Sequence, residues 1–288
     1  MANNILGILN KTIWIGTFSI LMLILFLSFI NTSWLQEISL KNNYIFSNQA
    51  MLKSLWEGYK DDYIEEETFR TLDRQRDDIT TSEGQSYTML RAMWQDDKET
   101  FDKSWQWTKD NLWKDNKLFA WLFGKREDDT YGILNNIGGQ NAAIDGDTDI
   151  AMALLFAYAR WGDSRYLLEA DSIINAIWDE SVVIIDNRPY ITSNDIEQFN
   201  QDTVLLNPSY YAPYAYRMFA DINPTNDWQG VVDTSYEIIS KSSQLPLDKN
   251  KSVGLPPDWV IIDRNTGDLR DPESDNITTN YSFDADRV

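Results

Sequence analysis

The sequence predicts an all-α fold: one large, mostly helical domain that follows an apolar N-terminal segment. Apolar residues recur three or four positions apart in successive stretches from about residue 48 onward. Only residues 182–191 have the β-branched composition and central turn of a strand pair. No Pro- or Gly-rich break divides residues 50–288, whose length suits a single large domain.

The N-terminal segment predicts a membrane anchor. Residues 13–30 are 18 residues without a charge, close to the roughly 20 with which a helix spans a bilayer. A cleaved signal peptide has a shorter apolar stretch and a small-residue cleavage site, which residues 31–34 match poorly. Lys11 and the amino terminus favour a cytoplasmic start. We therefore expect residues 1–12 in the cytoplasm, 13–30 as a single-pass signal anchor in the cytoplasmic membrane, 31–49 as a polar tether and 50–288 as the domain on its outer, periplasmic or extracellular, side.

Seven stretches of the domain have the helical pattern. The clearest is 147–161, where Ile150, Leu154, Tyr158 and Trp161 share one stripe. The predicted helices cover residues 49–59, 82–94, 101–113, 147–161, 164–178, 209–220 and 226–240. The strand pair is predicted at 182–185 and 189–191, around a turn at 186–188.

Composition excludes several functions. The chain has no His and no Cys, so it cannot build a Ser-His-Asp triad, a Cys-His pair, a disulfide or an imidazole or thiolate zinc site. A net charge of -20 argues against nucleic acid as a partner. The 12 Trp, 14 Tyr and 12 Phe residues either fill a helical core or stack on a flat, uncharged ligand such as a sugar ring. Any acid or base chemistry falls mainly to carboxylates.

Three acidic positions could perform that chemistry, and each has a structural alternative. Glu83 would lie in a first helical turn, capped by Thr81 or Ser82, where it could simply complement the helix dipole. Asp145 begins the alternating acids of residues 145–149, one or two of which could be ordinary first-turn acids. Asp284 and Arg287 would share a helical face, as in an ordinary surface ion pair.

The acids at 145–149 also invite comparison with a calcium-binding loop. Such a loop needs a Glu at its twelfth position, where this chain has Phe156. No metal and no other cofactor is therefore predicted.

Four segments in order resemble glycoside hydrolase family 8, the family of bacterial endoglucanases, lichenases, chitosanases and xylanases. They are TSEGQSYTM at 81–89, AIDGDTDIAMALLFAYARW at 143–161, NPSYYAP at 207–213 and FDADR at 283–287. The second follows the family signature over its whole length, with Ile144 where Ser or Thr is usual. The resemblance spans about residues 50–288. It implies an (α/α)6 toroid that would be incomplete at the C-terminus, because the family normally has further helices after the fourth segment.

The resemblance also implies roles for individual residues in an inverting mechanism. Glu83 resembles the general acid, Asp145 the residue that grips the sugar at the cleavage point, and Asp284 the general base. In an inverting pair the two working carboxyl groups stand roughly 6.5–9.5 Å apart. The implied substrate-binding residues are Trp121, Tyr87, Tyr210, Tyr211 and Arg287.

The sequence thus predicts an endo-acting hydrolase of cellulose or a related neutral β-1,4-glucan. A membrane anchor would suit a role beside the cellulose synthesis machinery. Two alternatives stay open: a catalytically inactive glucan-binding or scaffold protein, and a chitosanase or xylanase of the same family.

Overall fold

The computed structural model describes residues 48–244, 246–247, 250–251, 254–272, 277 and 279–285. The chain divides at residue 58 into two units. Residues 48–58 are the described part of the first unit, and they are helical, as predicted for this stretch. The helix continues into the second unit and ends at residue 63. The predicted anchor at 13–30 and residues 31–47 of the predicted tether at 31–49 lie outside the described residues. Within the part of the chain that is described, no helix is both long and apolar enough to cross a bilayer.

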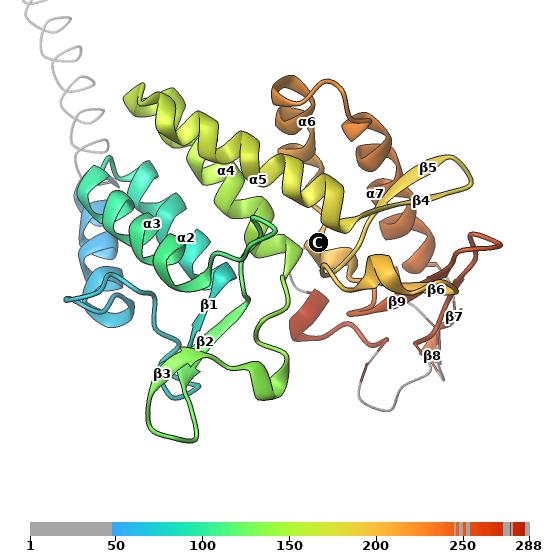
Figure 1. The fold of residues 1–288 in the computed structure, drawn as a ribbon, viewed down its shortest axis with the longest axis horizontal. Coiled ribbons are helices and arrows are strands. Elements are labelled where there is room, and N and C mark those ends of the chain that lie inside the picture. The colour runs from blue at the N-terminus through green and yellow to red at the C-terminus, as the bar shows by residue number, and fades with distance from the viewer. Residues whose placement is uncertain are drawn as a thin grey trace, which may run out of the picture. The chain divides into compact units, whose positions relative to one another are not determined.

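The second unit is mostly helical, as predicted (Figure 1). Its long helices are α2 (Ser82–Trp94), α3 (Lys98–Leu112), α4 (Ile144–Trp161), α5 (Ser164–Ser181), α6 (Pro213–Ile222) and α7 (Trp228–Ser242). Acidic or hydroxyl side chains cap four of them: Thr81, Asp97, Asp163 and Asp227 each accept a hydrogen bond from a first-turn N–H. Gly162, with φ of 72°, ends α4 in the left-handed conformation that glycine adopts readily.

The helices pack as successive hairpins. α2 packs on α3, α4 on α5 and α6 on α7, while α4 also packs on α2 and α6. Every residue from Ile144 to Leu155 of α4 is buried, so this helix forms the centre of the domain, whereas α3 and α5 bury one face. Short turns join the helices within each hairpin, and the long connections 113–143 and 182–212 join one hairpin to the next.

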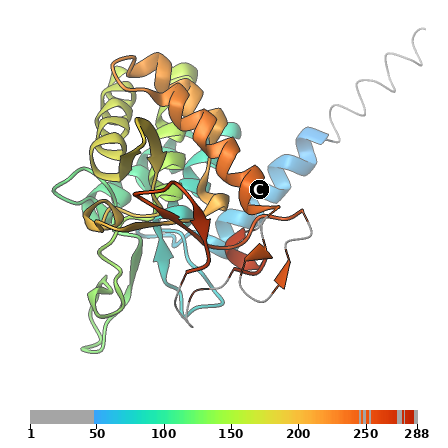
Figure 2. The same ribbon diagram turned by 90° about the vertical axis from the view of Figure 1, so that its right-hand side faces the viewer.

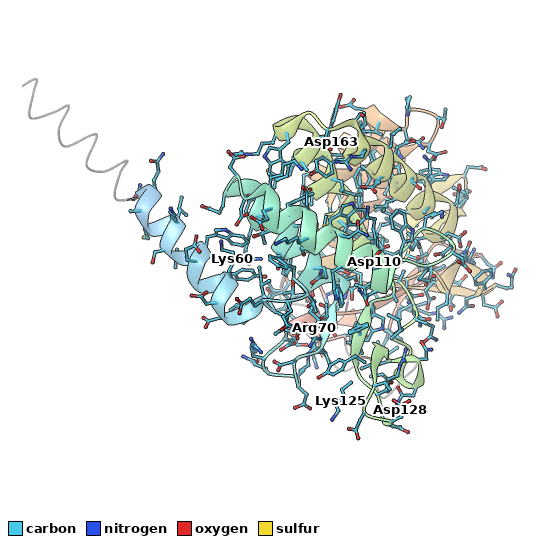
Figure 3. All side chains as sticks on the ribbon, turned by 60° about the vertical axis from the view of Figure 1, so that its left-hand side comes forward. Lys60, Arg70, Asp110, Lys125, Asp128 and Asp163 are labelled. Carbon is cyan, nitrogen blue, oxygen red and sulfur yellow. The ribbon has the colours of Figure 1, made fainter. Side chains whose placement is uncertain are left out.

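Short antiparallel strands occupy the long connections. One sheet has the order β1-β2-β3, from β1 (Thr80–Thr81), β2 (Leu122–Lys125) and β3 (Tyr131–Ile133). Lys125 and Asp128 lie toward the tip of the β2–β3 hairpin, away from the helices (Figure 3). A second sheet has the order β10-β9-β6, from β6 (Thr203–Leu206), β9 (Val260–Asp263) and β10 (Leu269–Arg270). β6 and β9 lie below the lower end of α7 (Figure 1), and in the turned view the red C-terminal strands lie beside that end of the helix (Figure 2).

The remaining elements are brief. β4 (Val182–Ile185) pairs with β5 (Arg188–Ile191), and β7 (Pro246–Leu247) with β8 (Asn250–Lys251). The described residues also form four 3-10 turns: η1 (Asn135–Ile137), η2 (Glu197–Phe199), η3 (Pro208–Tyr210) and η4 (Phe283–Ala285).

Two details of the predicted pattern are wrong. Strands are not confined to residues 182–191, because the two three-stranded sheets add several more. The helix predicted at 209–220 is instead a 3-10 turn, η3, followed by α6. Pro213 explains the break: it has no N–H to continue a helix from residue 209, but it suits the first turn of a new one.

Candidate active site

Glu83 lies half-buried in the first turn of α2, as predicted. Thr81 caps the helix by accepting a hydrogen bond of 2.9 Å from the Gly84 N–H. Tyr87 lies one turn further along the same face and donates its hydroxyl proton to Glu83 Oε1 over 2.7 Å. The Tyr87 hydroxyl therefore fixes the direction of the Glu83 carboxyl group.

A half-open hollow of about 260 Å³ lies beside this carboxyl group. Arg91 stands over the Tyr87 ring, 5.4 Å from its centroid, and over the Tyr59 ring at 4.7 Å. The hollow therefore combines aromatic rings with charged side chains. Its lining residues include Tyr59, Tyr63, Thr71, Asp73, Arg76, Glu83, Tyr87 and Arg91.

Asp145 lies in the first turn of α4 and is only 4% exposed. The next residue, Gly146, lies at a close approach between α4 and α2. A Cβ atom at Gly146 would lie 2.5 Å from Ser82 Oγ and 2.9 Å from the Glu83 backbone N. The absence of a side chain thus allows the two helix starts to touch, and it brings together the segments that carry Glu83 and Asp145.

Trp121 lies between the same two helix starts. Its carbonyl oxygen accepts a 3.1 Å hydrogen bond from the Ser82 N–H, and its own N–H donates to Asn141 O over 2.9 Å. The indole N–H donates to Gly138 O at 3.0 Å, and the side chain is half-buried. The Trp121 backbone therefore adjoins the start of α2, and the indole is held by Gly138 with part of its surface accessible, which suits a stacking platform for a sugar.

Two buried carboxyl groups that the sequence argument left without a role hold the segment before Trp121. Asp147 is fully buried in α4, and its Oδ1 accepts a 2.9 Å hydrogen bond from the Phe119 N–H. Asp195 accepts hydrogen bonds from the Ala142 N–H at 2.8 Å and from Asn116 Nδ2 at 3.1 Å. It also forms an ion pair with Lys114. Together they fix residues 114–121 against the start of α4.

The two carboxyl groups differ in protonation. Burial raises the pKa of the Asp147 carboxyl well above its usual range, and the nearby Asp195 and Asp145 charges add to the shift, against the Phe119 hydrogen bond and Lys114. Burial also disfavours ionisation of Asp195, but the Ala142 N–H and the Lys114 ammonium group outweigh it and lower its pKa. Asp147 is thus the neutral partner and Asp195 the ionised one.

Asp147→Asn should stabilise the protein relative to the wild type as the pH rises. Because the folded-state pKa of Asp147 is raised, the folded chain keeps a proton that the unfolded chain releases above about pH 4. The wild type therefore loses stability between that pH and the raised pKa, whereas Asn has no proton to lose. Urea denaturation at pH 3.5 and pH 7 measures this, and a stability difference that does not change with pH would contradict the neutral assignment.

Asp284 lies in η4, exposed, in a different group of contacts. Its Oδ2 accepts a 3.2 Å hydrogen bond from the indole N–H of Trp259. The Trp259 ring meets the Tyr210 ring edge to face, with centroids 5.9 Å apart. Two segments that the sequence singled out separately, 207–213 and 283–287, thus meet through Trp259, a residue that it did not single out.

The remaining sequence candidates differ in exposure. Tyr210 is half-buried, whereas Tyr211 is only 8% exposed, and its hydroxyl has no hydrogen-bond partner among the described residues. A ring so enclosed offers little surface for stacking. Arg287, predicted beside Asp284, lies outside the described residues.

Hydrogen bonds connect the start of α4 with the segment that leads to Tyr210. The Ile144 N–H donates to Ser193 O at 3.2 Å, and the Ser193 N–H donates to Leu205 O at 3.4 Å. Leu205 belongs to β6, which leads directly into Asn207 and η3. The contacts therefore bring the turns bearing Glu83 and Asp145 together, and they link Asp284 to Tyr210 through Trp259. The distance between Glu83 and Asp284 stays a prediction.

Known proteins share both the sequence and the fold. The family model for glycosyl hydrolases family 8 matches residues 33–288. An endoglucanase of Cellulomonas uda is 32% identical over 242 residues, which cover 83% of this chain and 63% of that protein. Endoglucanase 2 of Ruminiclostridium josui is 34% identical over 224 residues, 74% of this chain and 44% of that protein. The chain thus spans between two fifths and two thirds of the length of these relatives.

Solved structures show the same relationship. An endoglucanase of family 8 from Klebsiella pneumoniae is 30% identical, with a TM-score of 0.70 over 81% of this chain and 71% of that one. An endo-β-1,4-glucanase from Acetobacter xylinum is 26% identical, with a TM-score of 0.70 over 82% of this chain and 70% of that one. From the family match and these relatives together, the chain belongs to glycosyl hydrolases family 8.

Proposed function

We propose that this chain is an endo-acting, inverting glycoside hydrolase that cleaves β-1,4-glucan. The observation that carries the proposal is the contact at Gly146, which brings the turn bearing Asp145 against the turn bearing Glu83. Family membership and the endoglucanase relatives support the reaction class. The absence of His and Cys suits it, because hydrolysis by two carboxyl groups needs neither.

In the proposed reaction Glu83 is the general acid. Its carboxyl proton passes to the glycosidic oxygen as the bond from that oxygen to the anomeric carbon breaks. Asp284 accepts a proton from a water molecule whose oxygen bonds to the anomeric carbon on the opposite face, which inverts its configuration. The net reaction consumes one water, and the two carboxyl groups regain their starting protonation through solvent.

The remaining residues bind and orient the chain of sugars. Asp145 would hold hydroxyl groups of the sugar at the cleavage point, and Trp121 would support a neighbouring ring. Tyr87 directs the Glu83 carboxyl by its hydrogen bond. Tyr210 would bind sugar near Asp284, with Arg287 as a further contact, while the enclosed Tyr211 would support Tyr210 from below. A neutral substrate fits the strongly acidic chain better than a polyanion does.

We also propose the wider arrangement that the sequence suggests. α2, α4 and α6 would be inner helices of an (α/α)6 toroid and α3, α5 and α7 outer ones, which the hairpin packing supports. Residues 13–30 would anchor the domain outside the cytoplasmic membrane, where it could act near the cellulose synthesis machinery.

The test is reducing-sugar release and loss of viscosity with carboxymethylcellulose, with xylan and chitosan as comparison polymers. We expect a rapid fall in viscosity with carboxymethylcellulose, because an endo-acting enzyme cuts internal bonds. Faster sugar release from xylan or chitosan would show that the substrate is that polymer and not β-1,4-glucan. Binding to cellulose without sugar release from any polymer would show that the chain is a glucan-binding protein and not an enzyme.

A further inference from the structure

Asp258 is a buried carboxyl group that no step of the proposed reaction uses. It is 0% exposed. Its Oδ1 accepts a 2.8 Å hydrogen bond from the Ser282 N–H, and its Oδ2 accepts one from the Ser282 hydroxyl. The Asp258 N–H in turn donates to Asn280 O at 2.7 Å. A buried carboxyl group is costly unless it is hydrogen-bonded, so these bonds tie Asp258 to the chain two residues before Asp284.

The next residue, Trp259, reaches Asp284 itself. Its indole N–H donates to Asp284 Oδ2 at 3.2 Å, while its ring packs edge to face on Tyr210. Asp258 therefore holds the backbone that leads into η4, and Trp259 holds the carboxyl group that η4 carries. The two neighbours act on the same short turn by different bonds.

Neighbouring elements hold Asp258 and Trp259 themselves in place. Val260 begins β9, the central strand of the second sheet, and pairs with Leu206 of β6. Pro256 and Pro257, just before Asp258, are buried. η4 has only three residues, and its Ala285 N–H donates to Ser282 O at 3.2 Å. An exposed side chain on so short a turn depends on such outside contacts for its direction.

We propose that Asp258 and Trp259 are positioning residues for Asp284: Asp258 fixes the turn through Ser282, and Trp259 aims the carboxylate through its indole N–H. This inference rests on the proposed function, in which Asp284 is the general base. A misplacement of about 1 Å in a reacting group can lower a rate by about 10²-fold. Hydrogen bonds that fix the direction of this exposed carboxylate therefore affect the rate of hydrolysis directly.

Trp259→Phe tests the second bond, because it removes the indole N–H and keeps an aromatic ring against Tyr210. We expect kcat to fall about 10-fold with KM within about twofold of the wild type. A merely structural role would lower the yield of folded protein and leave kcat per folded molecule unchanged.

Trp161→Phe is the matched control. Trp161 also donates its indole N–H to an exposed carboxylate, Asp96 Oδ1, at 2.8 Å, but it lies at the last residue of α4, far along that helix from Asp145. This variant should keep both kcat and KM. Asp258→Ala should lower kcat more than Trp259→Phe does, and Asp258→Asn should recover part of the loss because its amide oxygen can still accept from the Ser282 N–H.

A second measurement tests the bond without activity. In ¹⁵N spectra of the full chain, the indole signal lost in Trp259→Phe should change position in Asp284→Ala, which removes the acceptor, and should change less in Asp258→Ala. If the wild type releases no sugar, the proposed function fails, while the indole signal still decides whether Trp259 binds Asp284. If the wild type is active but Trp259→Phe leaves kcat unchanged, or the indole signal is the same in the wild type and Asp284→Ala, the positioning inference is overturned and the proposed function stands.

Discussion

Glu83→Gln should lower kcat for β-1,4-glucan hydrolysis by about 10²–10⁴-fold, the usual contribution of a positioned general acid. Gln keeps the size of the side chain and can still accept the hydrogen bond from Tyr87, but it has no proton to give to the leaving oxygen. KM should change little, because the substrate contacts of Asp145 and Trp121 are untouched. Initial rates on carboxymethylcellulose measure both constants.

Glu99→Gln is the matched control for this prediction. Glu99 is the second residue of α3, as Glu83 is the second residue of α2, so both carboxylates complement a helix N-terminus. Glu99 is exposed and pairs with Lys103 at 2.7 Å. If Glu83 only stabilised the N-terminus of its helix, Glu83→Gln and Glu99→Gln would have the same activity. Equal sugar release from the wild type and Glu83→Gln would remove Glu83 from the reaction.

Gly146→Ala should disrupt the domain and its activity together. The new Cβ atom would lie 2.9 Å from the Glu83 backbone N, and backbone cannot move aside as a flexible side chain can. Overpacking of this kind costs about 1–3 kcal/mol, more than the roughly 1 kcal/mol that Ala normally gains over Gly inside a helix. α2 and α4 would separate at their starts, so we also expect activity to fall by more than the unfolded fraction explains.

Gly58→Ala provides the comparison for that variant. Gly58 is also helical, but nothing lies within 4 Å of the place where its Cβ would be. It should therefore show only the helix-propensity gain and no loss of activity. Urea denaturation and specific activity of the folded protein separate the two variants. A Gly146→Ala protein as stable and active as Gly58→Ala would contradict the close contact between the helix starts.

The helices were largely predictable because their signal is local. Residues 82–94 have the predicted bounds, and the hairpin at 182–191 differs by one residue. The strands of the second sheet could not be found in this way, because β6 pairs with β9, more than fifty residues away, with no tight turn between them. Runs of four residues such as 203–206 and 260–263 have too few alternations to identify a strand on their own.

The candidate site, too, was predictable only where its signal is local. Glu83 and Asp145 are named by short motifs, and the structure brings their segments together through Gly146, a residue within one of those motifs. Asp195, Asp258 and Trp259 could not be found from the sequence, because they contact chain segments 24 to 81 positions away. Their burial and partners become visible only when the long connections are folded against the helix starts.

The most direct test of the central claim is the configuration of the sugar that is released first. Proton NMR of the wild-type chain cutting a soluble cello-oligosaccharide can record the anomeric signals before mutarotation mixes them. Inversion by Glu83 and Asp284 predicts the α-anomer as the first product from the β-linked substrate. The β-anomer as first product would contradict the inverting pair of carboxyl groups, and the absence of any product would contradict hydrolysis itself.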